Sequence, residues 1–301
     1  MPDELSRKSK LVKQLVADFN NNKRLTSKYS TNFYGKSDID EEFSYPEHLV
    51  PERISMENFE MEKLTWVDSD SPWVILHFHG GGYVGAIRKH YKSMAGLYSE
   101  VGMGATVLSV DYRVAPEHPF PAALEDAMAS YEWLLENGFH EEQIVVAGDS
   151  AGGGLAMALC HNLKSMWRKT PAGIIAMSPW TDLTASGESY RDNFEIDPVF
   201  GNDRSELIFN NPYIGDANPR DPRISPMFGD FTGFPPMLIQ VGTDEMLLSD
   251  SETVAAKAKA AGVKVRFTKY PGMFHVFQMA GTILDESKKA WAEVKRFLEE
   301  I

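Results

Sequence analysis

Short apolar runs recur along the chain from Trp73 onward. Each is five to seven residues long, and they occupy residues 73–79, 105–110, 143–147, 173–177, 237–241 and 265–269. Nearly continuous apolar runs of this length are typical of strands that are buried on both faces of a sheet. The pattern therefore predicts a series of buried strands.

Helical patterns separate these runs. They fall at about residues 87–101, 121–137, 151–167, 250–261 and 283–300. Strands that alternate with helices form a mostly parallel central sheet with helices on both of its faces. We therefore predict the α/β fold class. A chain of 301 residues is within the size that such a fold reaches as one unit, so we expect a single domain over residues 1–301.

Two regions depart from the alternation. The first 22 residues have apolar side chains three and four positions apart, which predicts an amphipathic helix. Residues 23–52 are polar and rich in turn residues, and residues 53–67 have the pattern of one or two strands. Residues 181–234, the inserted segment, hold five prolines and several aromatic residues but no strand-like run. We expect about 1–50 and about 181–234 to form a helical cap over the sheet.

Composition and charge exclude several classes of protein. Hydrophobic residues make up 43% and charged residues 24%, which are ordinary values for a globular protein. The net charge of −13 argues against nucleic acid and an anionic membrane as partners. Cys160 is the one cysteine, so no internal disulfide and no cysteine-based zinc site can form. The charged N-terminus lacks the apolar core of a secretion signal, and we expect a cytoplasmic location.

A candidate nucleophile lies in Gly148-Asp149-Ser150-Ala151-Gly152, which matches the pattern G-x-S-x-G. The pattern follows a predicted strand directly and precedes a predicted helix of small residues. A sharp turn between strand and helix crowds the backbone, so the flanking positions must be small, and the turn lifts the serine hydroxyl out of the sheet. The alternative is a tight turn with an idle serine.

A second glycine-rich turn, His79-Gly80-Gly81-Gly82, follows the strand at 73–79. A serine nucleophile creates a tetrahedral intermediate with a negatively charged oxygen, which needs backbone N–H donors at close range. Consecutive glycines permit that close approach. By itself, the turn fits a flexible connection as well as it fits an oxyanion hole. Together with the serine pattern, it predicts an oxyanion hole.

The base that a serine needs is predicted at His275, just past the last strand. The chain order serine, acid, histidine places the acid after the preceding strand, where Asp244 and Glu245 both have suitable chemistry. Asp250 lies further into the next helix and is a weaker candidate. His77 and His79 have strand spacing, but no third ligand with suitable spacing follows, so we predict no metal site and no cofactor.

Four motifs, in order, carry a resemblance to a known family. They are HisGlyGlyGlyTyr at 79–83, AspTyrArgValAlaProGluHisProPheProAla at 111–122, GlyAspSerAlaGlyGly at 148–153 and TyrProGlyMetPheHisValPhe at 270–277. The chain resembles the bacterial hormone-sensitive lipase family of α/β-hydrolase esterases, in its GlyAspSerAlaGly subgroup. The resemblance runs from about Trp73 to the C-terminus and implies an α/β-hydrolase fold with a helical cap.

The resemblance also implies roles for the reacting residues. Ser150 is the implied nucleophile and His275 the implied base. The family's acid, normally aspartate, lies two residues before a leucine and about thirty before the histidine. Glu245 fits both spacings, since Leu247 follows it by two and His275 by thirty, and we favour it over Asp244.

Backbone groups complete the implied site. The oxyanion donors implied by the resemblance are the N–H groups of Gly81, Gly82 and Ala151. The histidine of the glycine turn, His79, braces the loop in the family and does not react.

The implied activity is hydrolysis of carboxylic esters with short to medium acyl chains, by a monomer or homodimer that acts on a small-molecule ester. The candidates to line the substrate pocket are aromatic: Tyr83, Phe33, Tyr34 and Phe209, with Phe194 and Phe200. The alternative is that these side chains pack the cap on the body. Two other functions use the same fold. One is a receptor that binds a small ligand without turnover, and the other is an amidase or peptidase.

Overall fold

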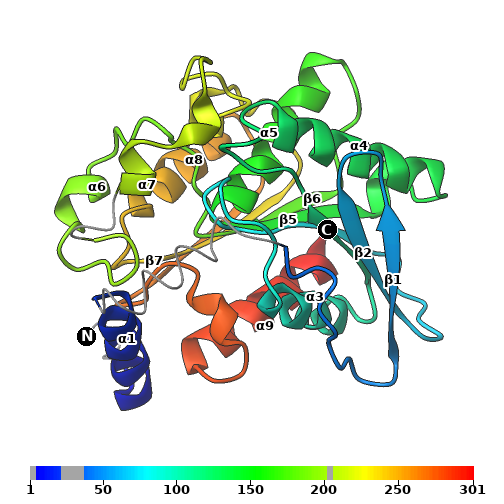
Figure 1. Ribbon diagram of the computed structural model, residues 1–301, viewed down its shortest axis with the longest axis horizontal. Helices are drawn as coiled ribbons and strands as arrows, with labels where there is room; N and C mark the ends of the chain where they lie inside the picture. The colour runs from blue at the N-terminus through cyan, green and yellow to red at the C-terminus, as the bar shows by residue number, and fades with distance from the viewer. Residues whose placement is uncertain (1–4, 22–36, 202–205) are drawn as a thin grey trace.

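The computed structural model describes residues 5–21, 37–201 and 206–301, and an eight-stranded sheet runs through its centre (Figure 1). The strands are β1 (Leu49–Ser55), β2 (Glu60–Trp66), β3 (Val74–Phe78), β4 (Thr106–Asp111), β5 (Ile144–Asp149), β6 (Gly173–Met177), β7 (Met237–Gly242) and β8 (Val265–Tyr270). Their order in the sheet is β1-β2-β4-β3-β5-β6-β7-β8, and all neighbours from β4 to β8 are parallel. The predicted α/β-hydrolase fold is confirmed.

Helices cover both faces of this sheet. The long ones are α1 (Arg7–Asn21), α3 (His90–Val101), α4 (Ala122–Glu136), α5 (Ala151–Ser165), α8 (Leu248–Ala260) and α9 (Asp285–Glu300). The short ones are α6 (Ser189–Asp192), α7 (Glu206–Phe209), and the 3₁₀ turns η1 (Glu141–Gln143), η3 (Pro212–Ile214), η4 (Pro226–Phe228) and η5 (Phe277–Ala280). Figure 1 shows α4, α5 and α8 on one face and α3 and α9 on the other. Every long helix matches a helical pattern in the sequence.

Strand β3 shows why its sequence is mostly apolar. All five of its residues are buried. Val74, Leu76 and Phe78 belong to the core that includes α4 and α5, whereas Ile75 belongs to the core that includes α3 and α9. A strand that contributes to two cores in alternation needs apolar side chains at most positions. His77 is the polar residue of β3; it is buried, and its Nδ1 lies 3.2 Å from the Ser109 hydroxyl.

The first strand begins earlier than its sequence indicates. Residues 23–52 have an irregular pattern, but β1 already starts at Leu49 and pairs antiparallel with β2. Pro51 lies inside β1, opposite Leu64. Proline is tolerated there because β1 is an edge strand with a partner on one side only.

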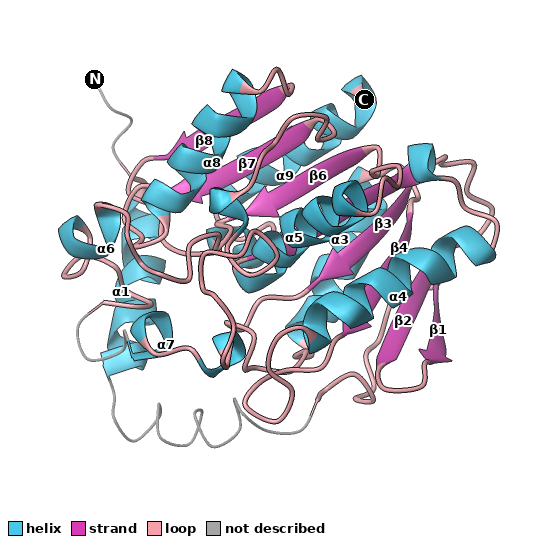
Figure 2. Ribbon diagram, turned by 90° about the horizontal axis from the view of Figure 1, so that it is seen from above, coloured by secondary structure: helices cyan, strands magenta, loops and turns pink. Residues whose placement is uncertain are grey.

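The order of the strands decides which loops meet. Strand β3 lies between β4 and β5, the next two strands along the chain, so the strand order reverses direction at β3. In open α/β sheets, ligand sites lie at the carboxyl ends of the strands where the order reverses. Phe78 is in register with Gly148, so the loops after β3 and β5 start side by side. Gly242 and Tyr270 bring the loops after β7 and β8 together in the same way. Figure 2 shows α1, α6 and α7 gathered at this end of the sheet.

The inserted segment contains no strand in its described part. It divides into two portions. Its first portion reaches the loops at the strand ends. Its last portion packs on α5, where the rings of Phe231 and Phe234 lie 5.2 and 4.6 Å from that of His161. The cap boundaries stay a prediction.

Within the described ranges, no helix combines the length and apolarity needed to cross a membrane.

Candidate active site

Ser150 occupies a strained turn between β5 and α5. Its φ and ψ are 52° and −122°, a region that residues with a side chain seldom adopt. A Cβ atom on Gly148 would lie 2.4 Å from the backbone of Gly152, and one on Gly152 would lie 2.1 Å from the carbonyl oxygen of Phe78. Both positions therefore require glycine, and the close packing of β5, α5 and β3 fixes Ser150 at the carboxyl end of β5.

Free backbone donors lie beside this turn. Residues 79–82, the glycine loop, follow β3, and no described group accepts a hydrogen bond from the N–H of Gly81 or Gly82. Gly81 has a φ of 117°, and a Cβ atom there would lie 2.9 Å from the carbonyl oxygen of Gly85. Ala151 opens α5, and the first N–H groups of a helix have no partner inside it. These donors are suited to an anion.

Side chains from two other parts of the chain hold the glycine loop. The Tyr112 hydroxyl donates to the carbonyl oxygen of His79 at 2.6 Å, and the two rings stack 4.1 Å apart. Asn211, from the inserted segment, donates from its side-chain amide to the carbonyl oxygen of Gly82 at 2.8 Å. Burial lowers the pKa of His79 to about 4, so its ring is neutral at pH 7. Its Nδ1 atom lies 2.6 Å from the carbonyl oxygen of Gly80, within the loop itself.

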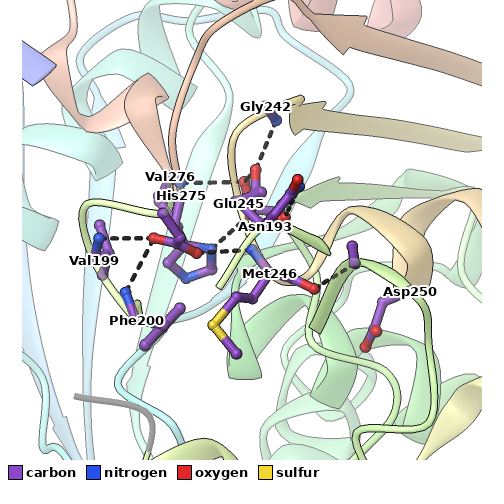
Figure 3. A network of polar contacts seen from close by, with 12 residues as sticks. Asn193, Val199, Phe200, Gly242, Glu245, Met246, Asp250, His275 and Val276 are labelled. Carbon is purple, nitrogen blue, oxygen red and sulfur yellow. Dashed lines mark hydrogen bonds and ion pairs between the residues drawn. The ribbon is translucent and has the colours of Figure 1, made fainter. Parts of the chain in front are cut away.

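His275 and Glu245 form a buried pair at the ends of β7 and β8 (Figure 3). The Nδ1 atom of His275 lies 2.8 Å from Oε2 of Glu245. The other carboxylate oxygen accepts from the N–H of Gly242 at 2.6 Å and from the Ser178 hydroxyl at 2.8 Å. Ser178 in turn accepts from the N–H of Val276 at 3.1 Å. The carboxylate is thus fully hydrogen-bonded and fixes the ring of His275.

The other two candidate acids are engaged elsewhere. Asp244 forms an ion pair with Lys13 of α1. Asp250 is buried, and its carboxylate accepts from the N–H groups of Thr181 and Asp182, each at 2.8 Å. Of the three carboxylates, the one within hydrogen-bond distance of His275 is that of Glu245.

The inserted segment is fastened to residues 243–247, the acid loop. The Asn193 amide donates to the backbone carbonyl of Glu245 at 2.8 Å, and the N–H of Met246 donates to Asp197 at 2.7 Å (Figure 3). Asp197 also accepts from the N–H groups at 199 and 200, and the ring of Phe200 lies 4.6 Å from that of His275. The wall of the site and the acid loop are therefore one connected structure.

A cavity of about 640 Å³ joins these parts and is lined by Ser150, His275, Gly81 and Gly82. We call it the central cavity. Most of its walls are apolar and come from α1, the inserted segment and the chain after β8. The residues are Val12, Leu15, Val16, Phe19, Val199, Phe200, Leu207, Phe274, Val276, Phe277, Met279 and Ala280. Such a cavity suits a small ligand with an apolar part.

The expected pocket residues have different positions. Phe200 lines the central cavity, whereas Phe209 and Phe194 line a separate surface hollow beside α6. Tyr83 is buried, and its ring stacks on that of Tyr213 at 4.0 Å, so it packs the inserted segment on the body and does not reach the cavity. Phe33 and Tyr34 lie outside the described residues.

Several residues of the site carry no sequence signal. Ser178, Asn193 and Asn211 are single polar residues in loops, and nothing in their spacing distinguishes them from surface residues. The wall formed by α1 does have a signal, since its apolar residues recur three and four apart. Among the described residues, no group of three His, Cys, Asp or Glu could hold a metal ion.

Comparison with known proteins agrees with this geometry. Residues 75–279 match the α/β-hydrolase fold family. The chain is 40% identical over 225 residues to an esterase of Acinetobacter venetianus and 37% identical over 225 residues to an acetyl-hydrolase of Streptomyces hygroscopicus, with 74% of each chain covered in both cases. A crystal structure of an esterase from the bacterial hormone-sensitive lipase family superposes with a TM-score of 0.83 and 32% identity, over 99% of both chains. The chain therefore belongs to the α/β-hydrolase family and, within it, to the carboxylesterases of the bacterial hormone-sensitive lipase group.

Proposed function

We propose that this carboxylesterase cleaves esters of short to medium acyl length through Ser150, His275 and Glu245, with a covalent acyl-enzyme intermediate. The observation that carries the proposal is the buried hydrogen bond of 2.8 Å between His275 and Glu245, with His275 and Ser150 lining the same cavity. A nucleophile, a base and a group that orients the base are the three parts that serine catalysis needs.

The mechanism begins with the tautomer of His275. Its Nδ1–H donates to Glu245, which leaves Nε2 free to accept a proton. Ser150 Oγ attacks the ester carbonyl carbon as Nε2 takes its proton. The carbonyl oxygen becomes an oxyanion and is bound by the N–H groups of Gly81, Gly82 and Ala151. The C–O bond to the leaving group breaks, the alcohol leaves with the proton from His275, and the acyl group stays on Ser150.

Water completes the cycle. His275 takes a proton from a water molecule, whose oxygen attacks the acyl carbon, and the second oxyanion is bound by the same N–H groups. Collapse of this intermediate returns the proton to Ser150 and releases the acid. The carboxylate of Glu245 lies beside the imidazolium that forms twice in each turnover, and it stabilises that positive charge.

The apolar walls support short and medium chains as substrates. The central cavity has a volume of about 640 Å³, and its apolar lining lies beside Ser150. In a series of p-nitrophenyl esters, we expect kcat/KM to be highest between the acetate and the octanoate and to fall for the palmitate. A maximum at palmitate would contradict the chain-length part of the proposal.

The test of the mechanism is the variant Ser150→Ala with p-nitrophenyl butyrate as substrate. Removal of a triad nucleophile lowers kcat by about 10⁴-fold or more, and we expect a loss of that size with an unchanged circular dichroism spectrum. Ser165→Ala is the matched control, because Ser165 is an exposed serine at the end of the same helix. Activity of Ser150→Ala within tenfold of the wild type would refute the proposed mechanism.

A further inference from the structure

Asp149, the residue immediately before Ser150, makes a buried three-way contact with the glycine loop. One carboxylate oxygen accepts from the N–H of Gly80 at 3.2 Å, and the other accepts from the Tyr91 hydroxyl at 3.0 Å. The N–H of Gly80 also donates to the Tyr91 hydroxyl oxygen at 2.8 Å. The three groups come from the end of β5, the loop after β3 and the first turn of α3.

The contact explains why the loop has a glycine at position 80. A Cβ atom there would lie 2.3 Å from the carboxylate of Asp149 and 3.0 Å from the Tyr91 hydroxyl. No side chain can occupy that space while the carboxylate is present. Gly80 therefore lets the loop rest directly on Asp149, one residue before the N–H groups of Gly81 and Gly82.

Stability alone does not account for this carboxylate. Asp149 is 1% exposed, and within the described ranges its hydrogen-bond partners are neutral. A buried carboxylate that lacks a cationic partner is costly, and burial raises the pKa of Asp149 to about 7. Costly buried polar groups of this kind concentrate at functional sites.

The oxyanion hole has two halves on different strands. Gly81 and Gly82 follow β3, whereas Ala151 follows β5. We propose that Asp149 is a positioning residue that sets the distance between these halves. It lies two residues before Ala151 in the chain, and it is hydrogen-bonded to the glycine loop through Gly80 and Tyr91. The inference deepens the proposed function and rests on it.

The consequence differs from that of a residue that only stabilises the fold. The donors of an oxyanion hole act on the transition state and must lie within a few tenths of an ångström of their best positions. Loosening the loop should lower kcat and the affinity for a transition-state analogue by similar factors, while KM changes little. A loss of stability alone would lower the amount of folded enzyme and leave both constants of the folded fraction unchanged.

The experiment compares Asp149→Ala, Asp149→Asn and Tyr91→Phe with the matched control Tyr98→Phe. Tyr98 is a second buried tyrosine of α3, and its hydroxyl lies 3.8 Å from the sulfur of Met177. For each variant, kcat and KM are measured with p-nitrophenyl acetate, and Ki is measured for butylboronic acid, which forms a negatively charged tetrahedral adduct with a catalytic serine. Active-site titration corrects for any unfolded fraction.

We expect Asp149→Ala to lower kcat and weaken boronate binding by about 30- to 300-fold each, by analogy with the loss of one oxyanion donor. Tyr91→Phe should lose about tenfold. Asp149→Asn should recover most of the activity, because the amide oxygen still accepts from Gly80 and its NH₂ group can donate to Tyr91. Tyr98→Phe should stay within about twofold of the wild type.

Two results would overturn the inference. One is a kcat within threefold of the wild type for both Asp149→Ala and Tyr91→Phe; the other is a loss of kcat with no change in boronate Ki. If Asp149→Ala does not fold, Tyr91→Phe carries the test by the same criteria. Ser150→Ala is assayed in parallel: if it stays active, the proposed function fails, whereas an inactive Ser150→Ala with an unaffected Asp149→Ala rejects the role of Asp149 alone.

Discussion

Two regions build the proposed active site, and they hold their residues in different ways. At the end of the sheet, β3, β5, β7 and β8 position Ser150, Glu245 and His275 through strand register and buried hydrogen bonds. The inserted segment has no strand in its described part and contributes through single side chains, such as Asn193 and Asn211, that donate to backbone carbonyls of the first region.

The two regions therefore differ in how accurately they can position the groups that they carry. A sheet fixes loop positions through many cooperative contacts, so it suits the reacting groups, whose geometry must be accurate. A segment held by a few side chains can change without disturbing the sheet, so it suits the walls and clamps. Changes at the sheet end should therefore act strongly and on all substrates, and changes in the inserted segment and α1 should act weakly or on some substrates only.

The largest effect separates the two neighbouring carboxylates of the acid loop. Glu245→Ala should lower kcat by about 10²–10⁴-fold, because His275 loses the group that fixes its tautomer. Asp244→Ala should change kcat by less than about threefold, since its partly exposed ion pair with Lys13 has little energetic weight. Steady-state kinetics on both variants make the comparison. A larger loss for Asp244→Ala would assign the acid to Asp244 and contradict our account of the sheet end.

A moderate effect is expected at the clamp from the inserted segment. Asn211→Ala removes the hydrogen bond to Gly82, and one hydrogen bond contributes about 0.5–1.5 kcal/mol. We expect kcat to fall about 2- to 10-fold on every ester. Asn218→Ala is the control, because Asn218 is exposed in the same segment and its side-chain oxygen accepts a hydrogen bond from the N–H of Arg220, within its local turn. A loss above about 10³-fold for Asn211→Ala would erase the distinction between the regions.

The smallest effect should depend on the substrate. Val16 of α1 lines the central cavity, so Val16→Phe should raise KM for the octanoate about three- to fivefold, less than the 1.4 kcal/mol of a tenfold change. KM for the acetate should stay the same. Leu11→Phe is the control, since Leu11 is 59% exposed on the same helix and does not line the cavity. Equal changes for both esters would show that α1 does not act as a wall for the longer chain.

The sheet end was the predictable region for physical reasons. Strands buried on both faces leave nearly continuous apolar runs, and the strained turn at Ser150 demands small neighbours that appear as a motif. The choice of Glu245 over Asp244 came from the spacing that the family resemblance implies, and the structure puts the side chains of Glu245 and His275 within hydrogen-bond distance. Contacts between such loops can be predicted from the sequence because each loop directly follows a strand that the sequence pattern predicts.

The inserted segment was much less predictable. An aromatic residue leaves the same sequence signal whether it lines a cavity, as Phe200 does, or packs in the core, as Tyr83 does. The choice depends on the partner that the tertiary fold brings, which for Tyr83 is the ring of Tyr213, 130 residues away. Ser178 shows the same limit for polar residues, because its role depends on two strands that meet only in the folded chain.

The most direct test of the central claim, that Ser150, His275 and Glu245 act as one unit, is covalent labelling with a fluorophosphonate followed by mass spectrometry. We predict a single adduct on the peptide that contains Ser150 in the wild type, no adduct in Ser150→Ala, and labelling at least about 10²-fold slower in His275→Ala and in Glu245→Ala, since an unactivated serine is a weak nucleophile. An adduct at another residue, or equal labelling rates with and without His275, would contradict the account.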